Sequence, residues 1–203
     1  VQDKLLTRFN TAYYKTDGYR GLSREIIEAL PTATWKFSDK HSLTLDYDFR
    51  RNKTTPDNFG ILFDSGRGLA PVSPSTTYYS PLNKAEQTVN RAMALYEGKF
   101  SNAFKLRSAL IYDDRKIDFV RNAVGNVNNA NVITGRDLRV QNDKTSSVLQ
   151  QNEAVFKFIT GEVAHTVLAG IEFEYARLQT KRDTYTGFAN TSLLNPVFPE
   201  TDY

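Results

Sequence analysis

The feature that most constrains this chain is the unbroken alternation of apolar and polar residues in "HSLTLDYDFR", residues 41–50. Leu43, Leu45, Tyr47 and Phe49 fall on one side of an extended chain, and polar or charged residues fall on the other. A period of two is the signature of a β-strand. The same pattern recurs and predicts strands at approximately 3–15, 23–37, 42–53, 87–100, 104–118, 147–159 and 164–180. We therefore expect an all-β fold.

The connections between the predicted strands alternate strictly between short and long. The short ones are 38–40, 101–103 and 160–164, and the long polar ones are 54–86, 119–146 and 181–203. In an antiparallel up-and-down meander, successive connections emerge at opposite ends of the sheet. All tight turns are therefore expected at one end and all long loops at the other, which is how an outer-membrane β-barrel is organised.

Aromatic residues stand at two levels on the apolar side of these strands. Trp35 and Phe37, Phe100 and Phe104, and Phe156 and Phe158 flank the tight turns, and Tyr47, Phe49, Tyr112, Phe173 and Tyr175 lie farther along. At a tilt of about 40°, the step from Phe104 to Tyr112 spans roughly 21 Å of height, close to the apolar band of a membrane barrel. We expect this side to face lipid and the opposite side, which carries Lys105, Arg107, Glu172 and Glu174, to face a wet lumen. Met93, Leu95 and Leu168 are exceptions that turn toward the lumen.

Composition narrows the functional classes. The absence of cysteine excludes disulfides, thiol catalysis and Cys-based zinc sites. The net charge of +3 and the lack of a basic cluster argue against nucleic acid as a partner. No apolar stretch approaches the length of a transmembrane helix, and the first residues, "VQDKLLTRFN", do not have the pattern of a signal peptide.

Seven strands do not make a closed bacterial barrel, because such barrels use even strand numbers. The chain ends in "LLNPVFPETDY", which has two prolines and no alternation. An open sheet in a membrane would leave two unpaired edges in lipid. We therefore expect residues 1–203 to be one partial domain, a segment of a larger transmembrane β-barrel.

Four stretches, taken in order, resemble TonB-dependent siderophore receptors, in particular their ferrichrome-receptor-like branch. They are "LLTRFNTAYYKTDGYRG", "LPTATWKFSDKHSLTLDYDF", "FKFITGEVAHTVLAGIEFEYARLQT" and "LLNPVF". The resemblance implies a 22-stranded barrel in the bacterial outer membrane, filled by an N-terminal plug domain, that binds a ferric siderophore from outside. Uptake would be energised by the TonB complex, so the implied partners are the ferric siderophore, outer-membrane lipid, the receptor's own plug and TonB. The plug, the TonB-contacting segment and the remaining strands are not in this sequence.

Pairs of acidic residues and two histidines are the candidates for other chemistry. Asp46 and Asp48 share one side of a strand with Arg50, which favours ionised wall charges over a glycosidase pair with one raised pKa. His41 and His165 lie beside tight turns without convergent partners, so we interpret them as turn or membrane-interface residues. We expect no catalytic site, no metal site and no directly bound cofactor, and the protein is not expected to be an enzyme.

The first long loop is the best candidate for ligand contact, because it combines aromatic rings with a cation. The candidates are Phe59, Phe63, Arg67, Tyr78 and Tyr79. Rings and a guanidinium suit a bulky, partly anionic chelate such as a ferric siderophore. The alternative, equally open, is that these aromatics only pack the loop against the barrel rim. Two other functions also stay open: a complete small outer-membrane protein, adhesin-like or a membrane enzyme, and a soluble β-sandwich binding module.

Overall fold

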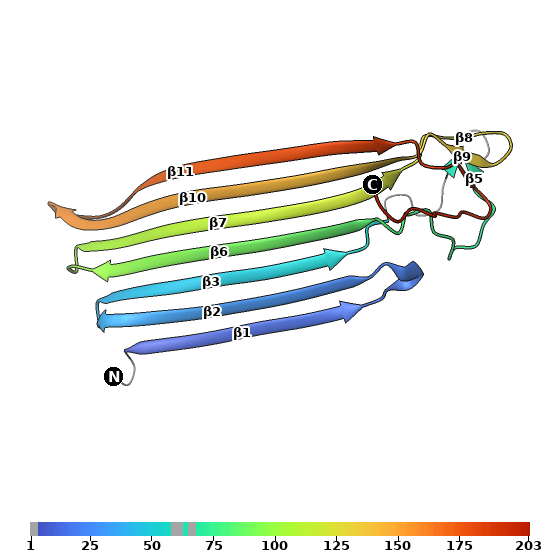
Figure 1. The fold of residues 1–203 in the computed structure, drawn as a ribbon. Coiled ribbons are helices and arrows are strands. Elements are labelled where there is room, and N and C mark those ends of the chain that lie inside the picture. The colour runs from blue at the N-terminus through green and yellow to red at the C-terminus, as the bar shows by residue number, and fades with distance from the viewer. Residues whose placement is uncertain (1–3, 58–62, 65–67) are drawn as a thin grey trace.

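Seven long strands form one antiparallel sheet, in which every strand pairs with the next one along the chain (Figure 1). The computed structural model describes residues 4–57, 63–64 and 68–203. The strands are β1 (Leu5–Thr16), β2 (Arg24–Ser38), β3 (His41–Thr54), β6 (Lys84–Lys99), β7 (Phe104–Ala123), β10 (Asp137–Thr160) and β11 (Val163–Thr186). The predicted meander of about seven strands is confirmed. Within the described residues β1 and β11 are the outer strands, so the sheet is open.

The tight turns gather at one end of the sheet and the long connections at the other, which we call the turn end and the loop end (Figure 1). The short elements lie at the loop end. They are η1 (Tyr19–Gly21), the hairpin of β4 (Phe63–Asp64) and β5 (Gly68–Leu69), and a small sheet of β8 (Asn126–Val127), β9 (Val132–Thr134) and β12 (Thr191–Ser192). Across the described part of the chain, no helix has the length and apolar character needed to cross a membrane.

The strands run farther toward the loop end than their sequence patterns predict. Residues 119–123, 137–146 and 181–186 belong to β7, β10 and β11 and not to the long connections. In these stretches both sides of the strand carry polar residues, as in "DLRVQNDKT" at 137–145. Alternation marks a strand only where one side is apolar, so the predicted boundaries were wrong at this end.

Continuous register divides the sheet into two faces. The pairing of β6 with β7, β7 with β10, and β10 with β11 runs without a shift, and the one irregularity is near Lys36 and Ser38 between β2 and β3. Paired residues point to the same side. The aromatic face therefore carries Trp35, Leu45, Tyr112, Phe156 and Tyr175, and the polar face carries Asp46, Arg50, Arg107, Glu153 and Glu172. The predicted division holds, and it places Met93, Leu95 and Leu168 on the polar face.

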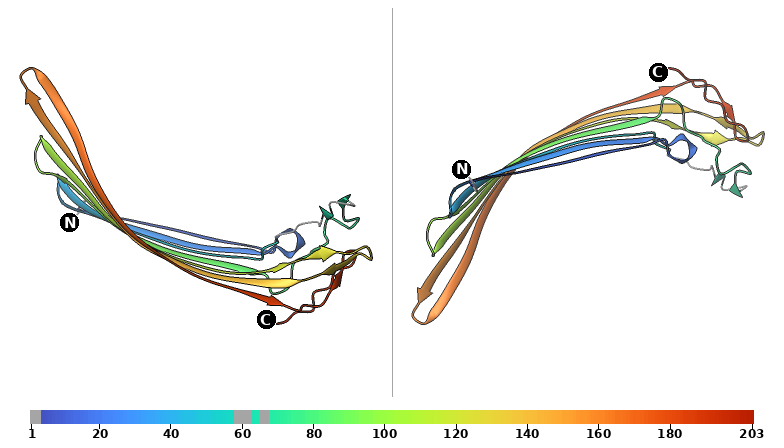
Figure 2. Two further views of the ribbon diagram at one scale, coloured as in Figure 1. Left: turned by 90° about the horizontal axis from the view of Figure 1, so that it is seen from above. Right: turned by 90° about the horizontal axis from the view of Figure 1, so that it is seen from below.

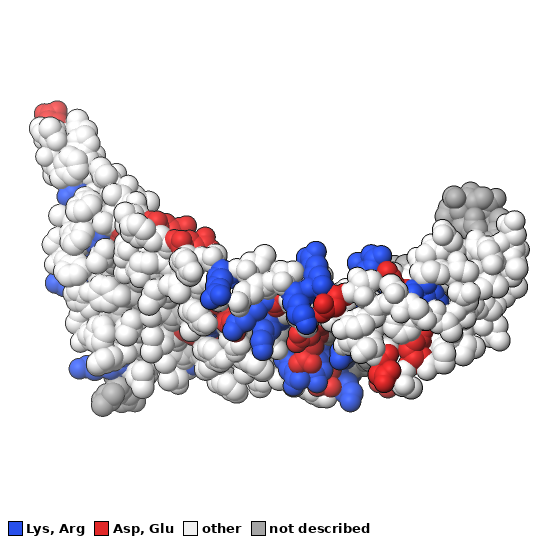
Figure 3. All heavy atoms as spheres, turned by 45° about the horizontal axis from the view of Figure 1, so that its top comes forward, with Lys and Arg blue, Asp and Glu red and all other residues white. Residues whose placement is uncertain are grey.

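Large apolar side chains on the aromatic face are open to the surroundings. Trp35 is 53% exposed, Phe173 62% and Tyr175 70%. Figure 3 shows a broad area almost free of charge over the turn-end half of the sheet, with Lys, Arg, Asp and Glu side chains gathered nearer the loop end. A soluble sandwich would cover such an area with a second sheet. The described residues provide none.

A chain of ring contacts crosses the aromatic face at the turn end. The centroid distances are 6.1 Å for His41–Tyr96, 5.1 Å for His41–Phe100, 5.3 Å for Phe100–Phe104 and 5.1 Å for Phe104–Phe156. His41 Nδ1 lies 2.7 Å from the Tyr96 hydroxyl. His165 likewise stacks on Phe158 at 4.9 Å. Both histidines thus lie among aromatic rings beside the tight turns, where the sequence places them.

Most buried side chains lie at the loop end, although Ala109 and Ile111 are buried in the middle of β7. One cluster joins Val120, Leu138 and Val140 to Leu82 and Phe188 on the aromatic face. Beside it, the Tyr203 ring lies 5.1 Å from Tyr185. Both views of Figure 2 place the C-terminal segment on the convex side of the bent sheet. Because this segment packs on the aromatic face, the aromatic face is convex and the polar face is concave.

Candidate functional site

Tyr78 joins three connections that are far apart in the sequence. Its side chain is fully buried and packs with Ile133 and Leu193 in a small core. Its hydroxyl donates a hydrogen bond of 2.7 Å to the Leu193 carbonyl. Burial raises the pKa of the Tyr78 phenol, while the positive charge of Arg20 acts in the opposite direction. The first, second and third long connections therefore form one packed unit at the loop end.

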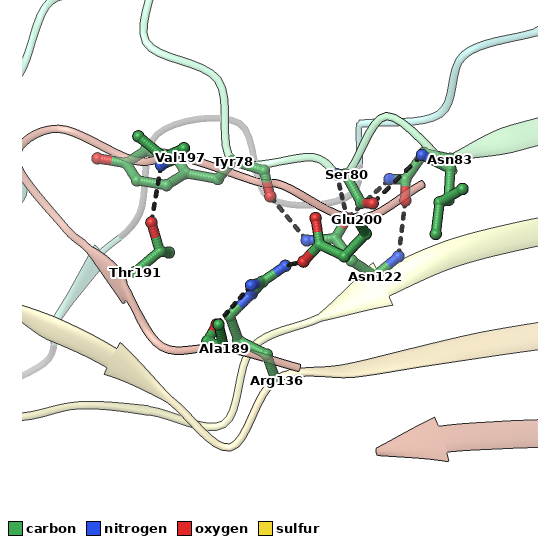
Figure 4. Close-up of polar contacts among 10 residues, drawn as sticks. Tyr78, Ser80, Asn83, Asn122, Arg136, Ala189, Thr191, Val197 and Glu200 are labelled. Atoms are coloured by element: carbon green, nitrogen blue, oxygen red, sulfur yellow. Dashed lines mark hydrogen bonds and ion pairs between the residues drawn. The ribbon is translucent and has the colours of Figure 1, made fainter. Parts of the chain in front are cut away.

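A buried network of amides fastens the first long connection to the end of β7 (Figure 4). Asn122 donates from Nδ2 to the Tyr78 carbonyl at 2.8 Å. Its Oδ1 accepts from Asn83 Nδ2 at 2.8 Å and from the Ser80 amide at 3.2 Å. The Asn122 amide in turn donates to Asn83 Oδ1 at 2.8 Å. Unsatisfied buried amides would cost about 1–3 kcal/mol each, so this mutual satisfaction fixes the path of residues 78–83.

Arg136 holds the C-terminal segment against the second connection. The side chain is buried and forms an ion pair with Glu200, whose side chain is also buried. It also donates to the Ala189 carbonyl at 2.6 Å, and its guanidinium lies 4.6 Å from the Phe198 ring centroid. Figure 4 shows Arg136 between the Ala189 carbonyl and Glu200. Removal of either charge would leave the other one buried without its partner.

The turn between β1 and β2 is tied to the same unit. Arg20 pairs with Asp57 at 2.9 Å and donates to the Thr76 carbonyl at 2.7 Å. The Tyr79 hydroxyl donates to the Arg20 carbonyl at 2.6 Å. Gly21 has a φ of +71°, and a Cβ there would lie 2.7 Å from the Tyr79 hydroxyl. A glycine at this position therefore permits both the turn and the Tyr79 contact.

The structure places two of the five predicted ligand residues in loop packing. Tyr78 lies in the small core, and the half-buried Tyr79 holds the β1–β2 turn. Phe63 belongs to β4 and pairs with Leu69. Phe59 and Arg67 lie outside the described residues. For Tyr78 the geometry favours the packing role that the sequence left open, and ligand contact by the five residues stays a prediction.

Sequence reasoning missed the polar residues that order the loop end. Asn83, Asn122, Arg136 and Glu200 are single polar residues within polar stretches, and no spacing or periodicity sets them apart. Their role depends on burial and on partners that are distant in the sequence. Asn83 and Asn122 are 39 residues apart, and Arg136 and Glu200 are 64 residues apart. Only the folded loops bring these partners together.

The polar face carries cross-strand ion pairs. Arg50 pairs with Glu28 at 2.6 Å and Arg107 with Glu153 at 3.4 Å. Asp46 accepts a hydrogen bond of 2.5 Å from the Thr32 hydroxyl. Arg50 thus pairs with a carboxylate on β2 and not with those of its own strand. Among the residues that the structure describes, no three metal-ligating side chains converge.

No protein-family model and no curated protein matches the sequence. The fold, however, is similar to solved siderophore receptors. The ferric-catecholate import receptor Fiu of E. coli K12, in its closed form, has 17% identity and a TM-score of 0.73, over 97% of this chain and 31% of Fiu. BauA, the ferric preacinetobactin receptor of Acinetobacter baumannii, has 15% identity and a TM-score of 0.79, over 98% of this chain and 31% of BauA.

The ferripyoverdine receptor of the outer membrane of Pseudomonas aeruginosa, bound to ferripyoverdine, has 16% identity and a TM-score of 0.77. That match covers 88% of this chain and 24% of the receptor. The chain thus spans between a quarter and a third of the receptors that it resembles. At this level of identity the likeness establishes the fold alone, an open antiparallel meander similar to part of the β-barrel of these receptors.

Proposed function

We propose that this chain is part of the barrel of an outer-membrane receptor that binds ferric siderophores and imports them with TonB-derived energy. The observation that carries the proposal is the two-faced open meander, which aligns over nearly its whole length with ferric siderophore receptors. The plug and the TonB complex would be partners of the full-length protein. Transport itself needs these parts, so the chain supplies the wall and the ligand-facing loops.

The aromatic face supports a membrane location. Rings lie at the turn end and again near Tyr112 and Tyr175, and the residues between them on β7 are Leu106, Ser108 and Leu110. Each arginine or lysine placed on a lipid-contacting face near the midplane would cost about 2–4 kcal/mol. On the strands of this face, charged residues occur only beyond the aromatic residues that lie farther from the turns. The polar face, in contrast, carries the Arg107–Glu153 ion pair between the two aromatic levels. Lipid outside and water inside account for both.

The first long connection is the proposed place of ligand contact. In both views of Figure 2, β4 and β5 lie on the concave side of the sheet. This connection contains Phe59, Phe63, Arg67 and Tyr79. Tyr78, in the same connection, holds it in the small core. A ligand that enters from the loop end would meet this connection above the concave polar face. The rings would supply rigid contact area at low conformational cost.

The test uses the full-length gene that contains this segment. Its deletion from the native host should abolish growth on a particular ferric siderophore as the only iron source, and plasmid-borne full-length protein should restore it. Restoration should fail in a host that lacks TonB. Normal uptake of every ferric siderophore by the deletion strain would contradict the proposal.

Two alternatives predict different behaviour of the purified chain. A complete small barrel would close on itself in detergent, but the described β1 and β11 have open edges that favour a partial barrel. A soluble sandwich would remain monomeric without detergent and unfold cooperatively. We expect the isolated chain to need detergent and to aggregate without it.

A further inference from the structure

The loop-end half of the polar face carries four arginines on three neighbouring strands. Arg115 and Arg121 lie on β7, Arg139 on β10 and Arg182 on β11, all with the parity of Arg107 and Glu153, whose ion pair marks the polar face. We call these four residues the arginine wall. Arg139 pairs with Asp137 at 3.3 Å. Arg115, Arg121 and Arg182 form no ion pair among the described residues, although the charges of Arg182 and Arg115 act on Asp143.

Arg121 and Arg139 are directly opposite each other in the β7–β10 register. Like charges that face each other across two strands destabilise a sheet. The Arg121 guanidinium lies 5.8 Å from the centroid of Phe119, its neighbour on the same face, which relieves the repulsion only in part. The Arg139 side chain is 52% exposed, so its charge is available to a ligand.

The wall has more positive than negative charge. The carboxylates on this part of the face are Asp113, Asp137 and Asp143. Asp113 pairs with Arg91 of β6 at 3.9 Å, and Asp143 accepts a hydrogen bond of 2.5 Å from Gln141 Nε2. With Arg91 counted beside the wall, five guanidiniums face three carboxylates, which leaves two positive charges in excess. The residues of β6 that face this part of β7 are Val89, Gln87 and Ala85, which are uncharged. Neighbouring strands therefore do not neutralise the wall.

The wall faces the space into which a ligand would pass. It lies on the concave face at the loop end, and β4 and β5 lie on the same concave side (Figure 2). A guanidinium presents a planar set of donors that matches two oxygens of a carboxylate or a similar anion. Phe119, which stands between Ile117 and Arg121 on this face, adds a flat ring beside these donors.

We infer that the arginine wall binds negatively charged oxygens of the cargo, so that this receptor takes a net-anionic ferric chelate in preference to an uncharged one. The inference rests on the proposed function and adds the charge class of its ligand. The anionic groups would be carboxylates or deprotonated phenolic oxygens at the surface of the chelate. They would add negative charge between Arg121, which has no ion pair among the described residues, and Arg139.

The experiment measures binding of two probes to the full-length receptor purified in detergent. One probe is a ferric tris-catecholate, which is net anionic, and the other is an uncharged ferric tris-hydroxamate of similar size. The variant is R121Q together with R139Q. We expect the affinity for the anionic probe to fall at least tenfold, equivalent to about 1.4 kcal/mol, and the affinity for the uncharged probe to change less than twofold. Affinity for the anionic probe should also weaken with added salt, more steeply in the wild type than in the variant.

Lys116 and Lys144 supply a matched control. They are also directly opposite each other on β7 and β10, but on the aromatic face. The pair K116Q and K144Q removes the same charge from the same strands and should leave both affinities unchanged. Equal losses for both probes, or wild-type preference for the uncharged probe, would overturn the inference while the proposed function stands. Failure of the wild type to bind any ferric chelate would remove the proposed function, and this inference with it.

Discussion

The hydroxyl of Tyr78 donates a hydrogen bond to the carbonyl of Leu193, 115 residues farther along the chain. Between them, Ile133 of the second connection completes the buried contact. One tyrosine thus couples all three long connections. At the loop end the three connections pack together into one unit, which adjoins the ends of β7, β10 and β11.

Replacement of Tyr78 by Ala should loosen this unit without affecting the barrel wall. Loss of a buried aromatic side chain typically costs about 3–5 kcal/mol, whereas Tyr78→Phe removes one hydrogen bond worth about 1 kcal/mol. Limited proteolysis of the full-length protein should show cleavage between residues 124 and 136 in Y78A and little change in Y78F. Equal resistance of wild type and Y78A would show that the tyrosine does not hold the connections together.

The buried ion pair of Arg136 with Glu200 should behave asymmetrically on mutation. Glu200→Gln leaves a buried guanidinium without its counter-charge, and loss of one partner from such a pair costs about 3–5 kcal/mol. Hydrogen exchange should accelerate across residues 187–203 in E200Q. The double replacement R136M and E200L should be less disruptive than E200Q alone. If the double variant exchanged faster than E200Q, the ion pair would be a net stabiliser and not a buried charge balance.

The two faces of β3 should tolerate charge very differently. Leu45 lies on the aromatic face and Asp46 on the polar face. Leu45→Arg should hinder membrane assembly of the full-length protein at a cost of about 2–4 kcal/mol, whereas Asp46→Lys should assemble normally. The folded fraction is read from heat-modifiable mobility in gels of outer-membrane extracts. Equal tolerance of both changes would argue against lipid on one face and a lumen on the other.

The two ends of the sheet should lie on opposite sides of the membrane. An epitope tag after Asn128, between β8 and β9, should be reached by antibody on intact cells. A tag after Asn102, in the turn between β6 and β7, should be reached only after the outer membrane is permeabilised. Each tagged protein must first support normal expression. The reverse labelling pattern would invert the topology.

The sequence predicts this fold best where lipid would impose a difference between the two sides of a strand. For β3, strict alternation predicts 42–53 and the strand is His41–Thr54. For β10, the predicted start at 147 is wrong, because the alternation that Leu138 and Val140 begin is broken by Asn142 and Lys144 on the same side, and the stretch still forms a strand. Beyond the apolar band of the membrane, water can solvate polar side chains on both sides of a strand. Strict alternation of apolar and polar residues is therefore not required there, and the sequence does not mark the strand.

The same misplaced boundary hid the arginine wall. Arg121 and Arg139 both fell within a predicted loop, where charged residues carry no positional meaning. Once β7 extends to Ala123 and β10 begins at Asp137, the register brings the two side chains face to face. The loop-end core was hidden for a different reason. Contacts such as Tyr78 with Leu193 depend on the path of long connections that have no periodicity.

The shared core also bears on how such a receptor can be re-engineered for another cargo. The usual approach exchanges one surface loop for that of a relative and keeps the scaffold. Here the exchange of any one connection would remove one residue of the shared core. The first connection contributes Tyr78, the second Ile133 and the third Leu193. A chimera that replaces a single connection should expose apolar surface and lose the packed arrangement of the connections at the loop end. The three connections should therefore be transplanted, and should diversify in evolution, as one inherited unit.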